Sequence, residues 1–90
     1  MLDLFFTARF KKDFKTMVRR SCKVELLDAI VEQLRLQNPL PPKHRDHELS
    51  GAYAGYRECH ITPDWLLIYK VESSALILTL TRTGSHSDLF

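Results

Sequence analysis

The sequence predicts an α+β domain in which one four-stranded sheet carries an antiparallel pair of helices on one face. The first observation is the order of the patterns, which runs strand, helix, helix and then three strands. The second is the shortness of the turns between the last three strands, which favours an antiparallel meander. A chain of 90 residues has the length of one domain, so we expect a single domain over residues 1–90.

The first half of the chain is predicted to form one strand and two helices. Apolar residues alternate at positions 2, 4 and 6, which indicates a short strand, and Thr7 is a suitable N-cap for the following helix. One face of that helix collects the apolar side chains of Phe10, Phe14, Met17 and Val18. A second helix is expected over residues 23–37, because its apolar residues repeat with helical spacing and the prolines after it end a helix. The short link between the two predicts an antiparallel helix hairpin.

The second half is predicted to be a polar loop followed by the meander. Residues 43–55 are polar and contain glycine, so we expect a loop with one short extended piece at Glu48 and Leu49. Strands are expected over residues 56–61, 65–71 and 75–82, and the third is nearly all apolar at its start, which favours a central position. Residues 85–90 then form a short tail. No element remains to cover the second face of the sheet, and an open face beside polar loops is a natural binding surface.

The net charge of +2 hides an uneven distribution along the chain. Residues 1–45 carry ten Lys and Arg against five Asp and Glu, whereas residues 46–90 carry three against six. The basic side chains are densest over residues 9–23, where Asp13 is the one acid. Such a stripe can hold phosphates, meet an acidic partner protein or face solvent, and the pattern alone does not choose among these.

The composition excludes several classes of protein. The chain is 44% hydrophobic and 27% charged with few Gly and Pro, which is typical of a folded domain and not of a disordered or low-complexity chain. No apolar run has the length of a membrane span and the N-terminus lacks a secretory signal pattern, so we expect a cytoplasmic protein without a membrane partner. Cys22 and Cys59 form no C-x-x-C motif and are expected to be free thiols.

Two pairs of polar residues could carry chemistry. His60 and Asp64 lie four positions apart across the Pro63 turn, and Arg82 and His86 lie four positions apart at the end of the last strand. Histidine can act as acid or base near neutral pH, and arginine can hold a phosphate with two donors. A base, an acid and a guanidinium suffice to cleave RNA without a metal, with the ribose 2′-OH as nucleophile.

Other readings of these residues stay open at this point. Each histidine can be a hydrogen-bonded structural residue, and Arg82 can be a salt-bridge partner. A zinc site is conceivable from His47, His60, Asp64 and His86, but no compact ligand pair with familiar spacing supports it. Whether the two polar pairs meet, and whether His47 from the loop joins them, depends on the fold.

Four segments of the second half carry a family resemblance. They read DHELSG from residue 46, GYRECH from residue 55, PDWLLIYK from residue 63 and RTGSHSDLF from residue 82. In this order and spacing they resemble the YafQ-like toxins of the RelE/ParE superfamily of bacterial toxin–antitoxin systems. The dense match covers residues 46–90, and the first half matches in the layout of a strand and a helix hairpin.

The resemblance implies a ribosome-dependent endoribonuclease, an mRNA interferase that cleaves messenger RNA in the ribosomal A site without metal or cofactor. It also implies a cognate antitoxin with a DNA-binding domain, expected to be of the ribbon–helix–helix type. Operator DNA would then be reached through the complex with that antitoxin. The catalytic positions of the family fall on His47, His60, Asp64, Arg82 and His86, and the substrate-binding positions on Trp65 and Phe90.

The resemblance also suggests roles. His86 is expected to be the general acid, and His60 and Asp64, alone or as a pair, are candidates for the base. Arg82 would stabilise the phosphorane, and His47 would assist the base or contact phosphate. Phe90 would stack on a nucleobase or serve as a hydrophobic plug, and Trp65 would lie near the site or pack in the core. His44 falls outside the motifs and is expected at the surface.

Two other functions compete with this one. A ParE-like toxin acts by binding and does not need the His, Asp and Arg set. A non-catalytic nucleic-acid-binding regulatory module would use the same histidines as structural residues.

Overall fold

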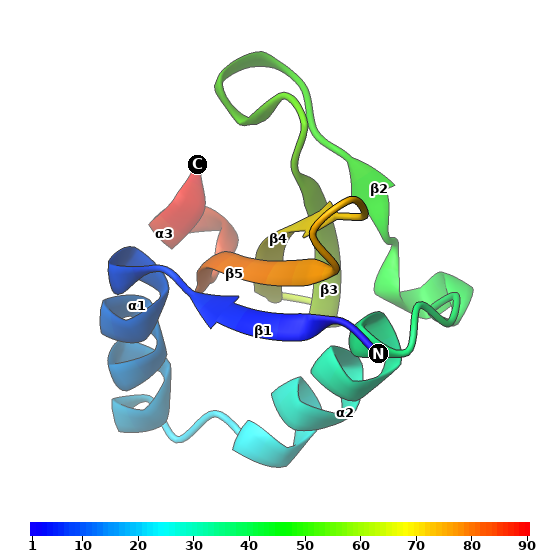
Figure 1. Cartoon of the computed structure of the whole chain (residues 1–90). Helices are drawn as coiled ribbons and strands as arrows, with labels where there is room; N and C mark the ends of the chain where they lie inside the picture. The colour runs from blue at the N-terminus through cyan, green and yellow to red at the C-terminus, as the bar shows by residue number, and fades with distance from the viewer.

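The computed structural model describes residues 1–90 and contains one mixed sheet (Figure 1). Its strands are β1 (Asp3–Phe6), β2 (His47–Glu48), β3 (Arg57–Thr62), β4 (Trp65–Glu72) and β5 (Ile77–Gly84). Their order is β1-β5-β4-β3-β2, with β1 parallel to β5 and every other pair antiparallel. The α+β class and the meander are therefore confirmed. The predicted count of four strands is wrong, because two residues of the predicted loop pair with β3.

Two helices follow the first strand, α1 (Ala8–Arg19) and α2 (Val24–Arg35). The predicted N-cap is confirmed, since the Thr7 side chain accepts a hydrogen bond of 2.9 Å from the backbone N–H of Phe10. The helices diverge from their connecting turn instead of packing side by side as a tight hairpin (Figure 1). The reason is that α1 lies against β5 whereas α2 lies against β3. A groove of about 510 Å³ opens beside them, lined mainly by Leu4, Phe6, Phe10, Phe14, Leu27 and Val31.

The main core lies between these helices and one face of the sheet. Strands β4 and β5 contribute Leu67, Tyr69, Leu78 and Leu80, each at most 2% exposed. The helices contribute Phe10, Met17, Leu27, Ile30 and Leu34. Full burial of one such side chain stabilises the fold by about 1.5–3 kcal/mol, so this layer is the main source of hydrophobic stabilisation of the sheet.

The second face of the sheet is partly covered, which corrects the expectation of an open face. The predicted tail is a helical turn, α3 (His86–Leu89), and its Leu89 packs on Leu66 and Ile68 of β4. Tyr53 and Tyr56, from the loop before β3, pack against the same small cluster. The middle of β4 is therefore buried on both faces. On this second face, the open space lies beside α3 and beside the loop that carries Tyr53 and Tyr56.

The two main helices, α1 and α2, have 12 residues each, so neither could span a membrane. Cys22 and Cys59 are both free. Burial raises the pKa of the Cys59 thiol to about 12, so this thiol stays protonated and unreactive at neutral pH.

Candidate functional site

The register of the sheet brings most of the predicted catalytic residues to one face. Side chains directly opposite each other in paired strands point to the same side. His47 lies opposite Glu58, Glu58 opposite Ile68, and Ile68 opposite Arg82. His60 follows Glu58 by two positions on β3 and therefore points the same way. His47, His60 and Arg82 thus share the face on which α3 sits.

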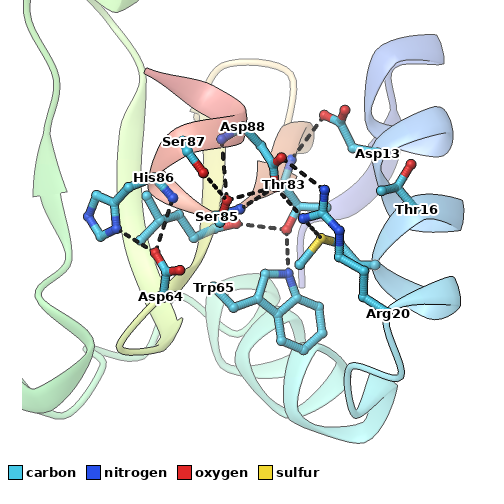
Figure 2. Close-up of polar contacts among 12 residues, drawn as sticks. Asp13, Thr16, Arg20, Asp64, Trp65, Thr83, Ser85, His86, Ser87 and Asp88 are labelled. Carbon is cyan, nitrogen blue, oxygen red and sulfur yellow. Dashed lines mark hydrogen bonds and ion pairs between the residues drawn. The ribbon is translucent and has the colours of Figure 1, made fainter.

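The turn after β5 adds His86 to this face (Figure 2). The carboxylate of Asp64 accepts hydrogen bonds from the His86 backbone N–H at 3.2 Å and from the His86 ring Nδ1 at 2.8 Å. These bonds lower the pKa of Asp64. Because a carboxylate only accepts, Nδ1 of His86 carries the proton and Nε2 is left for chemistry. Asp64 is thus a hydrogen-bond partner of His86. The ring of His60 lies close by, with its centroid 5.5 Å from that of His86.

A buried carboxylate lies beneath the other two histidines. The Glu58 Oε1 atom is 3.7 Å from the Nε2 atom of His47 and 3.7 Å from that of His60. Glu58 is only 5% exposed, and its Oε2 atom has no hydrogen-bond partner. Sequence reasoning missed this residue. The available signal was an acid in the middle of a predicted strand, two positions before His60 and so on the same face, because a carboxylate that a sheet buries is costly unless it is paired.

His44 is not a simple surface residue. Its side chain is half-buried, and its Nδ1 lies 2.7 Å from the backbone carbonyl of His60. This contact ties the loop before β2 to the strand that carries His60. The Nδ1 atom of His47 lies 2.6 Å from the carbonyl of Arg45, which directs the other ring nitrogen toward Glu58.

Arg82 is held by a residue that sequence reasoning left without a role. Asp13 of α1 binds the Nε and Nη2 atoms of Arg82 at 3.0 and 3.1 Å and also accepts from the Thr83 backbone N–H at 3.3 Å. The bond to Asp13 raises the pKa of Arg82, so the guanidinium stays charged. A guanidinium has five N–H groups, and its Nη1 edge remains without a carboxylate partner. That edge can receive a phosphate.

Phe90 and Trp65 have opposite environments. Phe90 is 65% exposed, and its ring meets Tyr53 edge-on with centroids 6.2 Å apart. Trp65 is only 3% exposed and belongs to the core beneath the helices. Its indole Nε1 donates a 2.8 Å hydrogen bond to the Thr83 hydroxyl. The structure therefore corrects the assignment of Trp65 to substrate binding, because its side chain lies on the face opposite the site.

Comparison with known proteins decides the family. A family model described as "Bacterial toxin of type II toxin-antitoxin system, YafQ" matches residues 2–90. The chain belongs to the YafQ toxin family. The resemblance predicted from the four segments of the second half is confirmed, and it extends over the first half as well.

Individual relatives of this YafQ-family toxin support the same family membership. The mRNA interferase toxin YafQ of Escherichia coli K12 is 37% identical over 90 residues, which cover 98% of this chain and 95% of the relative. A metal-bound toxin from Helicobacter pylori has a TM-score of 0.94 at 41% identity, with both chains covered in full. A YafQ chain in the E. coli DinJ–YafQ complex has a TM-score of 0.89 at 35% identity, covering 100% of this chain and 99% of its own.

The metal in the H. pylori relative raises the question of whether the present residues fit one. In this structure no three side chains of His, Cys, Asp or Glu are arranged so that they could hold a metal ion. His47 and His60 are instead grouped around the buried carboxylate of Glu58. This grouping does not fit a bound metal ion.

Replacement of Trp65 by Phe is expected to destabilise the fold. The variant removes the indole N–H that donates a hydrogen bond to the buried Thr83 hydroxyl, and it leaves a smaller ring in the core. Both changes should lower the free energy of unfolding, together by about 1–3 kcal/mol. Urea unfolding followed by circular dichroism measures this difference. An unchanged free energy of unfolding would contradict the structural role assigned to the indole.

Acid is expected to weaken the anchoring of α3. The Arg20 guanidinium binds Asp88, and this bond, with those from Ser85, holds the pKa of the Asp88 carboxyl far below its usual range. A carboxyl whose pKa is lower in the folded state stabilises the fold above its unfolded pKa of about 3.9, and that contribution is lost as the pH falls further. The free energy of unfolding should therefore fall between about pH 5 and about pH 2, and less steeply in Asp88→Asn. An identical pH dependence in the variant would refute this assignment.

Proposed function

We propose that this chain is a ribosome-dependent mRNA interferase that cleaves messenger RNA by general acid–base catalysis. Its E. coli relative carries the name mRNA interferase. The observation that carries the mechanism is the placement of His60 and His86, whose ring centroids are 5.5 Å apart on a face shared with Arg82. Two imidazoles at this separation can act on opposite sides of one phosphate.

His86 is the proposed general acid. Asp64 holds its Nδ1–H, so the ring orientation is set and Nε2 faces away from the carboxylate. In the protonated ring, Nε2–H donates to the 5′-oxygen as the P–O5′ bond breaks. The carboxylate of Asp64 stabilises the positive charge of the imidazolium before that transfer.

His60 is the proposed base, with Glu58 beneath it. The structure pairs Asp64 with His86, which favours His60 over Asp64 for the removal of a proton. The base takes the proton of the ribose 2′-OH, and the 2′-oxygen then forms a bond to phosphorus. This balance of bonds leaves a 2′,3′-cyclic phosphate on one fragment and a 5′-OH on the other. His47, which shares the Glu58 carboxylate, assists the base or contacts phosphate.

Arg82 and Phe90 complete the proposed site. Arg82, fixed by Asp13, stabilises the negative charge that grows on the equatorial oxygens of the phosphorane. Phe90 offers an exposed ring on which an unpaired nucleobase can stack. Both functions suit single-stranded RNA, and the need for a 2′-OH excludes DNA as a substrate.

The proposed partners are the ribosome and an antitoxin. The basic side chains of α1 give one surface for ribosomal RNA or for an acidic antitoxin segment. A related YafQ is known in complex with DinJ, so we expect a cognate antitoxin here, with a ribbon–helix–helix domain that brings the complex to operator DNA. The toxin itself would act in the cytoplasm.

Incubation of the toxin with programmed ribosomes tests the proposal. Primer extension maps the cuts, and the 3′ ends are analysed for cyclic phosphate, in a buffer that keeps the Mg²⁺ the ribosome needs, with and without a chelator selective for transition metals. We expect cleavage of A-site mRNA that this chelator leaves unchanged. Binding of the toxin to ribosomes whose mRNA stays intact would indicate a binding toxin, and cleavage abolished by the chelator would require a metal; either result would overturn the mechanism.

A further inference from the structure

The segment that carries His86 and Phe90 is too short to hold its own position. Helix α3 has four residues and lies at the end of the chain. An isolated turn of helix is unstable because its nucleation costs more than its few hydrogen bonds return, and chain ends fray unless they are tied down. The positions of His86 in α3 and of Phe90 directly after it therefore depend on the contacts that anchor this turn, which are the packing of Leu89 on β4 and the polar contacts of Asp88.

Asp88 is the centre of that anchor (Figure 2). Its Oδ2 accepts from the Ser85 backbone N–H at 2.8 Å and from the Ser85 hydroxyl at 2.9 Å, while the Ser85 side chain caps the Asp88 N–H. The turn is tight: a Cβ added to Gly84 would lie 2.9 Å from the Cβ of Asp88. The carboxylate thus closes α3 on the end of β5, two residues from His86 and two from Phe90.

Arg20 connects this centre to α1. Its Nη1 and Nη2 atoms bind the two oxygens of Asp88 at 2.6 and 3.0 Å, a bidentate pair across 68 positions of sequence. The backbone of Arg20 is itself fixed at the C-cap of α1, where its N–H donates to the carbonyls of Thr16 and Met17. The guanidinium therefore extends from a rigid base and holds the far side of α3, away from Asp64.

We propose that Arg20 is a positioning residue for the cleavage reaction, acting through Asp88 on the segment that bears His86 and Phe90. The inference rests on the proposed function of His86. His86 is held on one side by Asp64 and on the other, through the backbone of α3, by the Arg20–Asp88 pair. Loss of the Arg20–Asp88 pair lets Nε2 of His86 move away from the 5′-oxygen that it protonates. Small displacements of a reacting group lower the reaction rate strongly.

The test compares four single variants and one double variant in ribosome cleavage and in amide hydrogen exchange. Arg20→Gln removes the pair, Arg20→Lys keeps the charge without the two-pronged geometry, and Asp88→Asn removes the other partner. Arg19→Gln is the matched control for the loss of one charge from the basic surface of α1, since the adjacent Arg19 side chain hydrogen-bonds to the Thr16 hydroxyl and not to Asp88. The amides of Leu89 and Phe90 report on α3, because they donate to the carbonyls of Ser85 and His86.

We expect Arg20→Gln to lower the maximal cleavage rate about fivefold to twentyfold, with little change in the concentration at half-maximal rate. The Leu89 and Phe90 amides should exchange about fivefold faster, while core amides of β4 stay protected. Arg20→Lys should fall between wild type and Arg20→Gln. In the Asp88→Asn background, Arg20→Gln should add almost nothing, because the two residues act as one unit.

Other results would separate the possible failures. Suppose that Arg20→Gln raises only the concentration at half-maximal rate, that the Leu89 and Phe90 amides exchange as in wild type, and that Arg19→Gln has a similar effect. Arg20 would then be a contact for ribosomal RNA, and the positioning role would be overturned. The positioning role would also be overturned if these amides exchange faster but the cleavage rate does not fall. Failure of the wild-type toxin to cleave would overturn the proposed function, whereas wild-type cleavage with an unaffected Arg20→Gln would overturn this inference alone.

Discussion

Replacing His86 by Gln is expected to slow mRNA cleavage by roughly 10²–10⁴-fold, the usual contribution of a general acid or base. Glutamine can still form a hydrogen bond near Asp64 but cannot transfer a proton. The 5′-oxygen must then leave without protonation, which raises the barrier to breaking the P–O5′ bond. The measurement is the single-turnover rate on programmed ribosomes, made at saturating toxin so that binding does not contribute.

The size of this effect separates chemistry from positioning. Asp64→Asn is the matched variant, since it weakens the hold on the ring without removing the imidazole, and we expect it to cost less than His86→Gln. Affinity for the ribosome should be unchanged in both. A His86→Gln toxin that binds normally and cleaves at the full rate would show that another group protonates the leaving oxygen.

Replacing Arg82 by Gln is expected to lower the cleavage rate by about 10²–10³-fold while binding weakens far less. The reason is that negative charge on the phosphate oxygens increases from the ground state to the phosphorane, so the guanidinium is worth more in the transition state. Single-turnover rates measured over a range of ribosome concentrations separate the two effects. If the cleavage rate falls only at low ribosome concentration, because affinity is lost, Arg82 binds phosphate in the ground state and does not stabilise the transition state.

The control for Arg82 concerns its partner. Removal of the guanidinium leaves the Asp13 carboxylate, whose side chain is 12% exposed, without its main ligand. Some stability is therefore expected to be lost, so the folded fraction of each variant is measured by urea unfolding before rates are compared. Arg82→Lys retains the charge but not the paired contact with Asp13, and it should recover only part of the rate.

Much of the fold could be predicted because its signals are local. Alternation in β1, helical spacing in α1 and α2, the Thr7 cap and the turns of the meander each depend on residues close in sequence. The short extended piece expected at Glu48 and Leu49 overlaps β2 but is displaced by one residue, because His47 and Glu48 become a strand of the sheet only by pairing with β3. The divergence of α1 and α2 likewise depends on which strands they cover.

The site shows the same division. The residue types and spacing of His60, Asp64, Arg82 and His86 indicated acid–base chemistry on phosphate, and the family resemblance added His47 and Phe90 to the set. The pattern did not reveal that Asp64 serves His86, nor that Glu58 lies between His47 and His60. The register of paired strands and the turn into α3 decide both points.

Periodicity, turn residues and motifs along the chain were enough to predict the main strands and helices, the family and the residues able to do chemistry, but not the helical turn α3. The tertiary structure decided which of those residues meet. Asp13 reaches Arg82 across 69 positions, and Arg20 reaches Asp88 across 68. Such contacts arise when α1 packs its apolar face on the sheet, which brings its polar side chains beside the end of β5 and α3. Trp65 was placed in the core by the same packing.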